Sequence, residues 1–167
     1  FTALKLSNSM YQTDYVQSGL VTGTMWDAMM KFIAGGDDTI VTKSSWGNYK
    51  DGVVTYTEGQ GRYATVDLNN GAMTSAFTKS DGSYHYGIKT TAISENVKKK
   101  NLYDVAGNLW EWTTESASSS GQTGTFNMLR GGSFNNYYTK FPACYRHYDT
   151  VVFTFAHVGF RPVLYIK

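Results

Sequence analysis

The spacing of apolar residues changes from a helical to a strand-like period along this chain, and this change constrains the fold most. Near the N-terminus, TGTMWDAMMKFIAGG has the apolar spacing of an amphipathic helix, carried by Met25, Trp26, Met29, Met30 and Ile33. After Lys100, LWEWTTE alternates instead, so that Trp110 and Trp112 share one face of a strand. We therefore predict an α+β domain in which helices precede an antiparallel sheet with long loops.

Local signals set the limits of these elements. Thr24 followed by Asp27 resembles a capping box, and Gly35-Gly36 predicts the end of the helix. A shorter helix is expected from about Ser9 to Gln17. Further strands are expected at residues 126–132 and 159–166, and Pro162 favours a sheet edge or a strand end.

The middle of the chain, residues 37–100, has little periodicity and is rich in Gly, Ser, Thr and Asn. Dipeptides typical of turns occur at Asp51-Gly52, Asn70-Gly71 and Asp81-Gly82. Short strands are expected at residues 53–56 and 84–88. His85 has no second metal ligand at a suitable spacing, so we expect no metal site there.

Length and composition exclude several classes of protein. The 167 residues are most simply one domain, and because the chain starts at Phe1 we expect residues 1–167 to be the C-terminal part of a longer protein. The formal charge of +2 gives no reason to invoke nucleic acid, and no apolar run approaches the ~18 residues of a transmembrane helix. Cys144, the single cysteine, excludes an intramolecular disulfide and is expected to be a buried apolar residue.

Three elements in the last third resemble the formylglycine-generating enzyme (sulfatase-modifying factor) family. NLYDVAGNLWEWTTE, LRGGSFNN and GFRPVLYIK follow the order of that family's G-N-x-W-E-W, R-G-G-S and terminal G-F-R elements. VTGTMWDAMMKFI is similar to the family's amphipathic helix with a central Trp. The resemblance implies a C-type lectin-like fold in its formylglycine-generating enzyme variant, with two helices on a twisted antiparallel sheet and long loops.

The catalytic cysteines of that family have no counterpart here. Its enzymes oxidise a cysteine of a client protein and use two cysteines, just after R-G-G-S, that hold copper. The matching positions in this chain are Asn136 and Phe141. Neither side chain provides a thiolate for copper or for redox chemistry, and Cys144 is offset and single. We therefore expect no enzymatic activity and no required cofactor.

The resemblance also implies a structural calcium ion at the G-N-x-W-E-W turn. The matching candidate ligands are the side chains of Asp104 and Glu111 and the carbonyl groups of Gly107 and Leu109. Oxygen donors of this kind suit a hard cation. In the alternative interpretation, Asp104 caps a turn and Glu111 pairs with a strand arginine such as Arg161. Both interpretations stay open.

Residues 133–161 differ in composition from the rest of the chain. They contain no Glu, Gln, Met or Trp, whereas the first 132 residues contain eighteen of these. Apart from Lys140, every residue type present can be reached by changing the first two bases of an AAC codon. This pattern resembles the variable proteins of diversity-generating retroelements, which share the lectin-like fold and in which mutated adenines of a template repeat are copied into the 3′ end of the gene.

That resemblance implies a ligand-binding surface of varied side chains on a fixed scaffold. Lys140 and Arg146 are not among the candidate variable positions, and Phe134, Pro142, Cys144, Gly159, Phe160 and Arg161 are expected to be scaffold. The candidate ligand-binding positions are Asn136, Tyr137, Tyr138, Thr139, Tyr145, His147, Tyr148, Asp149, Thr150, Phe153, Thr154, Phe155 and His157.

Three functions remain in competition. The first is a non-enzymatic binding module in which residues 136–157 contact an unidentified protein or glycan on a cell, host or phage surface. For this module we expect a location on the bacterial cell surface, outside the cell or in a phage tail, with no nucleic-acid partner and no membrane insertion. The second is a fixed structural or accessory domain, in which the aromatic residues of this segment pack in the core. The third, opposed by the missing cysteines, is a formylglycine-generating oxidase.

Overall fold

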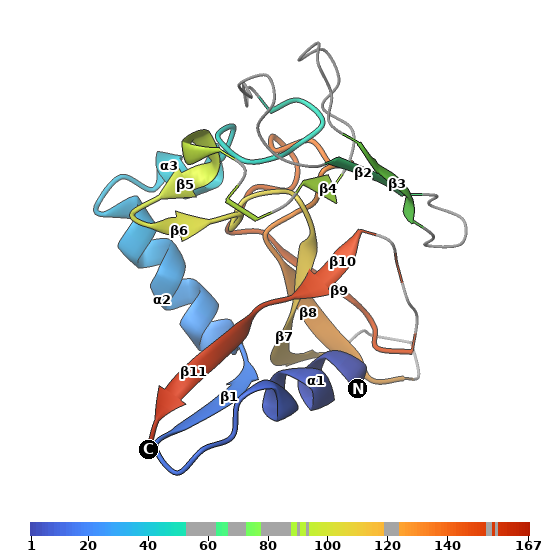
Figure 1. Ribbon diagram of the computed structural model, residues 1–167. Coiled ribbons are helices and arrows are strands. Elements are labelled where there is room, and N and C mark those ends of the chain that lie inside the picture. Colours follow the sequence, from blue (N-terminus) through green and yellow to red (C-terminus); the bar gives the residue numbers. More distant parts are fainter. Residues whose placement is uncertain are drawn as a thin grey trace.

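The computed structural model describes residues 1–52, 63–66, 73–77, 88–89, 91–92, 94–118, 124–152, 155 and 157–167. Its helices are α1 (Thr2–Met10), α2 (Gly23–Ala34) and the one-turn α3 (Thr39–Thr42), with a 3₁₀ turn at Glu95–Val97. The strands are β1 (Val16–Leu20), β2 (Tyr63–Val66), β3 (Met73–Phe77), β4 (Ile88–Lys89), β5 (Lys98–Lys99), β6 (Leu102–Tyr103), β7 (Trp110–Ala117), β8 (Phe126–Arg130), β9 (Arg146–Thr150), β10 (Val158–Phe160) and β11 (Pro162–Ile166). Helices precede most of the strands, so the predicted α+β class is confirmed (Figure 1).

Helix α2 forms where the apolar period predicts it. Thr22 is the N-cap: its backbone is extended, and its hydroxyl accepts a hydrogen bond from the backbone N–H of Met25 at 3.1 Å. The predicted cap at Thr24 is wrong, because the helix has already begun at Gly23. Gly35 ends the helix, as predicted, with a φ of 56° that glycine adopts without strain.

The helix predicted over residues 9–17 is wrong. Helix α1 lies earlier in the chain, and Tyr11, which follows it, has an extended backbone with φ of −139°. The hydroxyl of Thr13 accepts hydrogen bonds from the backbone N–H groups of Tyr15 and Val16, at 3.3 and 3.1 Å. This side-chain turn competes with helix formation, and the residues from Val16 onwards pair with β11 instead.

The main sheet has the strand order β10-β7-β8-β9 and carries the predicted alternation. Trp110 and Trp112 of β7 are buried and contact residues of α1 and β8 in one apolar cluster. Strands β7, β8 and β9 pair antiparallel, whereas β10 lies parallel to β7, so the sheet is mixed rather than wholly antiparallel.

Residues 159–166 form two strands rather than the single strand predicted. Strand β10 ends at Phe160, and β11 begins at Pro162 and pairs with β1 in a separate two-stranded sheet. Proline has no N–H with which to extend the ladder beside β7, so the chain leaves the main sheet at this point. The prediction that Pro162 lies at a sheet edge or a strand end is confirmed, because Pro162 is the first residue of β11.

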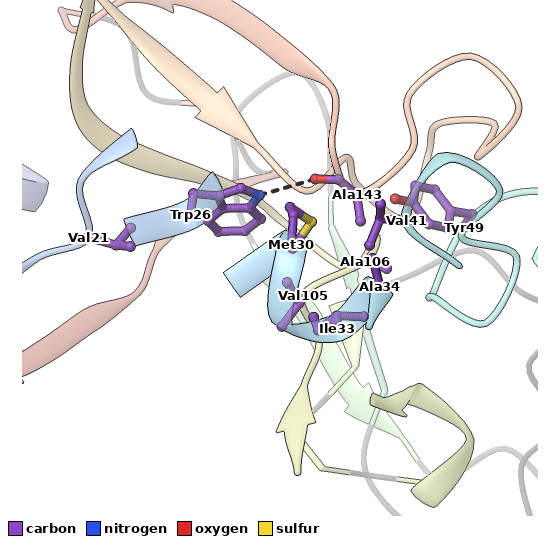
Figure 2. Close-up of a cluster of buried hydrophobic side chains, with 10 residues drawn as sticks. All are labelled: Val21, Trp26, Met30, Ile33, Ala34, Val41, Tyr49, Val105, Ala106 and Ala143. Carbon is purple, nitrogen blue, oxygen red and sulfur yellow. Dashed lines mark hydrogen bonds between the residues drawn. The ribbon is translucent and has the colours of Figure 1, made fainter. Parts of the chain in front are cut away.

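A buried cluster around α2 ties the helix to the segment after β8 (Figure 2). The indole Nε1 of Trp26 donates to the carbonyl of Ala143 at 3.2 Å, and the hydroxyl of Tyr49 donates to the carbonyl of Gly131 at 2.6 Å. Both donors are buried, so losing either acceptor would leave a polar group unsatisfied in the core. These bonds therefore hold the backbone of residues 131–143 in place.

Most elements expected in the middle of the chain lie outside the described residues. These are the turns at 70–71 and 81–82, the strand at 53–56, His85 and most of the strand at 84–88. Ile88 opens β4, which pairs with β2. The backbone N–H of Gly52 donates to the carbonyl of Tyr49 at 3.2 Å, so the chain does turn at Asp51-Gly52. None of the helices in the described ranges is long and apolar enough to cross a membrane.

Candidate functional site

The loop that follows β8 rests directly on the buried cluster. Gly132 has a φ of 74°, and a Cβ at this position would lie only 2.6 Å from the ring of Tyr49. Glycine is therefore required both by the backbone conformation and by the close approach of the ring. The RGGS element thus forms a tight turn that begins the candidate binding segment on a rigid base.

Asn136 is less available for a ligand than predicted. Its side-chain oxygen accepts hydrogen bonds from the backbone N–H of Ser133 at 3.1 Å and from the Ser133 hydroxyl at 2.8 Å. Its own carbonyl accepts a hydrogen bond from the backbone N–H of Lys50 at 2.9 Å. Because the side-chain acceptor closes the loop, the structure places Asn136 in the framework of this segment.

The next three candidate positions differ in exposure. Tyr137 is 42% exposed, and the ammonium group of Lys50 lies 5.1 Å from the centre of its ring. Tyr138 is half-buried, with its ring edge-on to Tyr49 at a centroid distance of 6.2 Å. Thr139 is exposed. Tyr137 and Thr139 thus face solvent, whereas the ring of Tyr138 is partly exposed and partly packed against the core.

Strand β9 divides its candidate positions between the two faces of the sheet. Tyr145, just before the strand, and His147 face Trp110, with ring centroids 6.3 and 5.4 Å from the indole. Tyr148 lies on the opposite face, edge-on to Phe126 at 5.9 Å. Tyr145 is 38% exposed and Tyr148 is 42% exposed, so each face of the strand presents one tyrosine to solvent.

The last candidate positions are half-buried around the end of the segment. Asp149 accepts a hydrogen bond from the backbone N–H of Thr150 at 2.7 Å, and the rings of Phe155 and His157 lie 5.6 Å apart. Burial lowers the pKa of His157; Asp149 opposes this shift and His147 adds to it. Phe153 and Thr154 lie outside the described residues.

A cavity of about 320 Å³ lies beside this end of the segment. Its lining contains one candidate variable residue, Phe155, and otherwise residues outside the candidate set, among them Phe1, Leu6, Trp112, Val152 and Phe160. Sequence reasoning missed this cavity, and it also missed that Trp110, Phe141 and Lys50 contact the candidate positions. Of these contacts, the sequence indicated only the one with Trp110, because the alternation in β7 placed this large ring on one face of the sheet to which β9 also contributes side chains.

The turn predicted to bind calcium holds an ion pair. Both carboxylate oxygens of Glu111 accept hydrogen bonds from the guanidinium of Arg161, at 2.7 and 2.9 Å, as the alternative interpretation predicts. Asp104 accepts from the backbone N–H of Ala92 at 3.1 Å. Burial raises the pKa of both carboxyl groups, and Arg161 opposes the shift in each. A calcium ion at this turn would share Glu111 with a cationic side chain, so calcium binding stays a prediction.

Nearby residues add little to the case for a metal. Burial lowers the pKa of Lys89 to about 7, an effect that Asp104 partly offsets. Across the described ranges, no group of three or more His, Cys, Asp or Glu side chains is arranged to hold a metal ion. Cys144 is half-buried, and burial raises the pKa of its thiol, which disfavours a thiolate at neutral pH.

A similar solved structure, with a TM-score above 0.5, supports the fold described above. The crystal structure of CarF is similar, with a TM-score of 0.53 and 19% sequence identity over 90% of this chain and 48% of that chain. Treponema denticola variable protein 1 has a TM-score of 0.47 and 17% identity over 91% of this chain and 49% of that chain. This chain spans about half the length of either structure. No curated protein sequence matches it significantly.

The sequence itself matches a protein family over most of its length. Residues 45–166 match the sulfatase-modifying factor enzyme 1-like domain, and this range contains β7, β8, the RGGS turn and β11. The resemblance seen in the three motifs is therefore confirmed, as is the predicted α+β fold of the C-type lectin-like, formylglycine-generating enzyme type. This chain belongs to the sulfatase-modifying factor enzyme 1-like domain family.

Proposed function

We propose that this domain is a non-enzymatic ligand-binding module whose segment 136–157 forms a diversified binding surface. The observation that carries the proposal is the exposure of Tyr137, Tyr145 and Tyr148 on a buried and hydrogen-bonded base. Tyrosine offers a large contact area with few rotatable bonds, which suits a surface that must recognise a ligand. The skewed composition of residues 133–161 supports the same interpretation.

At the two positions where the related enzymes carry catalytic cysteines, this chain has other residues, and these residues support a function without oxidation. Asn136 stands at the first position and uses its side-chain oxygen to close the loop after the RGGS turn. Phe141 stands at the second, and its ring packs edge-on against Tyr145 at 5.1 Å. Both positions thus serve the shape of the candidate surface, and neither supplies a sulfur atom for copper.

The ligand would be a protein or a glycan on the surface of a cell, host or phage. Exposed Tyr side chains would supply most of the binding free energy, and Thr139 and the polar groups of β9 would add hydrogen bonds. Such contacts require that the domain reaches its ligand outside the cell, as a bacterial surface or secreted protein or as part of a phage tail. Segment 136–157 would then act as the recognition element, and the rest as its scaffold.

Sequencing the coding DNA for residues 133–161 across many cells of the source population tests the proposal. We expect substitutions confined to AAC-type codons, together with a near-identical template repeat and a reverse transcriptase gene in the same locus. An invariant segment with no repeat would refute diversification. The half-burial of Tyr138, His147 and His157 would then favour a fixed accessory domain, in which these rings serve packing.

A further inference from the structure

We propose that Arg146 is a positioning residue that clamps β9 onto α2 and β7, and so determines which face each candidate ligand-binding side chain of residues 145–150 takes. The proposal rests on the function proposed above, because it concerns how the same segment is presented. Arg146 is the first residue of β9 and lies between Tyr145 and His147, two candidate contact positions.

Arg146 joins two acidic side chains that come from different elements. Its Nη1 donates to Oε1 of Glu115 on β7 at 2.9 Å, and its Nη2 bonds to Oδ2 of Asp27 on α2. The other oxygen of Asp27 accepts from Nη2 of Arg130 on β8 at 2.5 Å. Four charged side chains thus alternate in sign and connect α2 with three neighbouring strands of the main sheet.

Arg130 forms the buried half of this network. It is only 1% exposed, and its Nη1 donates to the carbonyl groups of Cys144 and Tyr145, both at 3.0 Å. A buried guanidinium requires such partners, because an unpaired buried charge is strongly destabilising. The backbone just before β9 is therefore held by Arg130, which lies opposite Arg146 in the β8–β9 register, while Arg146 holds the strand itself.

The position of Glu115 explains why glycine begins α2. A Cβ at Gly23 would overlap the carboxylate of Glu115, so any larger residue would displace this acid. The carboxylate thus lies at the positive end of the helix dipole, where a negative charge is favoured. The planar fork of arginine can bridge two carboxylates in fixed directions, which a lysine ammonium does less well.

This clamp has a direct consequence for recognition. Side chains alternate along a strand, so a slip of one residue would exchange the two faces of β9. With Arg146 held towards α2, Tyr145 and His147 must face Trp110 and Tyr148 must face Phe126. Arginine can be reached from an AAC codon, so the codon pattern alone does not exclude position 146 from variation. We expect the ion pairs with Asp27 and Glu115 to keep this residue an arginine.

Hydrogen–deuterium exchange of the whole domain tests the clamp without a ligand. We expect Arg146→Ala to speed amide exchange in residues 145–150 by about fivefold, the effect of losing two half-exposed ion pairs. Exchange in α2 and β11 should stay unchanged, and Arg146→Lys should restore part of the protection. Lys140→Ala, which removes an exposed positive charge from the same segment, is the matched control and should change nothing in β9.

Two results of the exchange experiment would overturn the clamp. Unchanged exchange in residues 145–150 of the Arg146→Ala protein would show that the ion pairs do not hold the strand. An equal increase throughout the domain would show that Arg146 supports global stability and not the placement of β9. Population sequences separate this inference from the proposed function. Free variation at position 146 within a varying segment refutes only the clamp, whereas an invariant segment refutes only diversification and leaves the exchange experiment decisive.

Discussion

Replacing Trp112 by alanine should remove a large part of the folding free energy, and the size of the loss can be worked out from the structure. The side chain is 7% exposed and packs edge-on to Phe1 at 5.5 Å. Burying roughly 200 Å² of a Trp at about 25 cal/mol per Å² contributes about 5 kcal/mol, of which the remaining methyl group keeps about 0.8 kcal/mol. Trp112 also lines the 320 Å³ cavity, so the space left behind would merge with it rather than close. We therefore expect Trp112→Ala to lower the free energy of unfolding by about 4 kcal/mol.

Urea denaturation followed by far-ultraviolet circular dichroism measures this loss. Thr114→Ala is the matched control, because Thr114 lies on the same strand with an exposed side chain, and its loss should stay within about 0.5 kcal/mol. The slope of the unfolding free energy against urea should be the same in both variants if the folded and unfolded states are unchanged. A loss below about 1 kcal/mol for Trp112→Ala would refute the reasoning, because removing a ring packed between α1 and the main sheet must lower the free energy of unfolding by more than this.

Three other predictions concern the candidate site and the pH dependence of stability. Tyr148→Ala should lower the free energy of unfolding by less than about 1 kcal/mol, whereas Tyr138→Ala should lower it by about 2 kcal/mol, because the ring of Tyr138 packs on Tyr49. Equal losses for the two variants in urea denaturation would contradict the prediction that the more buried tyrosine contributes more to stability. Burial lowers the pKa of His157 below its ordinary value of 6.5, so the unfolded chain binds a proton at this residue more readily than the folded chain, and stability should fall as the pH drops through 6.5. In melting curves recorded between pH 8 and pH 5, His157→Gln should reduce this loss of stability. The same pH dependence in the variant and in the original protein would contradict the prediction. Melting curves in EDTA and in calcium chloride distinguish the two interpretations of the turn at Glu111: the ion pair with Arg161 alone predicts the same melting temperature in both, whereas a bound calcium ion predicts a rise with calcium chloride that Asp104→Asn abolishes.

The elements that the sequence predicted best are those with a strong apolar period and large side chains. Strand β7 carries Trp110 and Trp112 two residues apart, and helix α2 carries Trp26 among Met and Ile residues at helical spacing, so each pattern fits only one kind of element. The predicted helix over residues 9–17 failed because its pattern was weak and a strand partner lay at the far end of the chain. The single strand over 159–166 failed for a similar reason, since the change of sheet at Pro162 depends on β1 and β7.

The candidate site was predictable as a segment but not in its detail. Composition singled out residues 133–161, and Tyr137, Tyr145 and Tyr148 in that segment are indeed exposed. The roles of Asn136 and Tyr138 could not be read from the chain, because they depend on contacts with Ser133 and Tyr49 that only the folded loop creates. Residue type marks which side chains suit a ligand, whereas tertiary contacts decide which of them remain free to meet one.

The pairing of β1 with β11 places a limit on how this domain folds during synthesis. Leu20 pairs with Pro162 and Val16 with Ile166, so the two strands close a loop that contains nearly all of the chain, and Figure 1 shows β1 and β11 side by side. Such distant contacts are slow to form, because the entropy of loop closure must be overcome before the pairing contributes. While the ribosome is still adding residues 162–166, β1 lacks the strand with which it pairs in the described part of the structure. Folding of this domain is therefore expected to finish only after translation of β11. By then the ribosome has already synthesised all of segment 136–157.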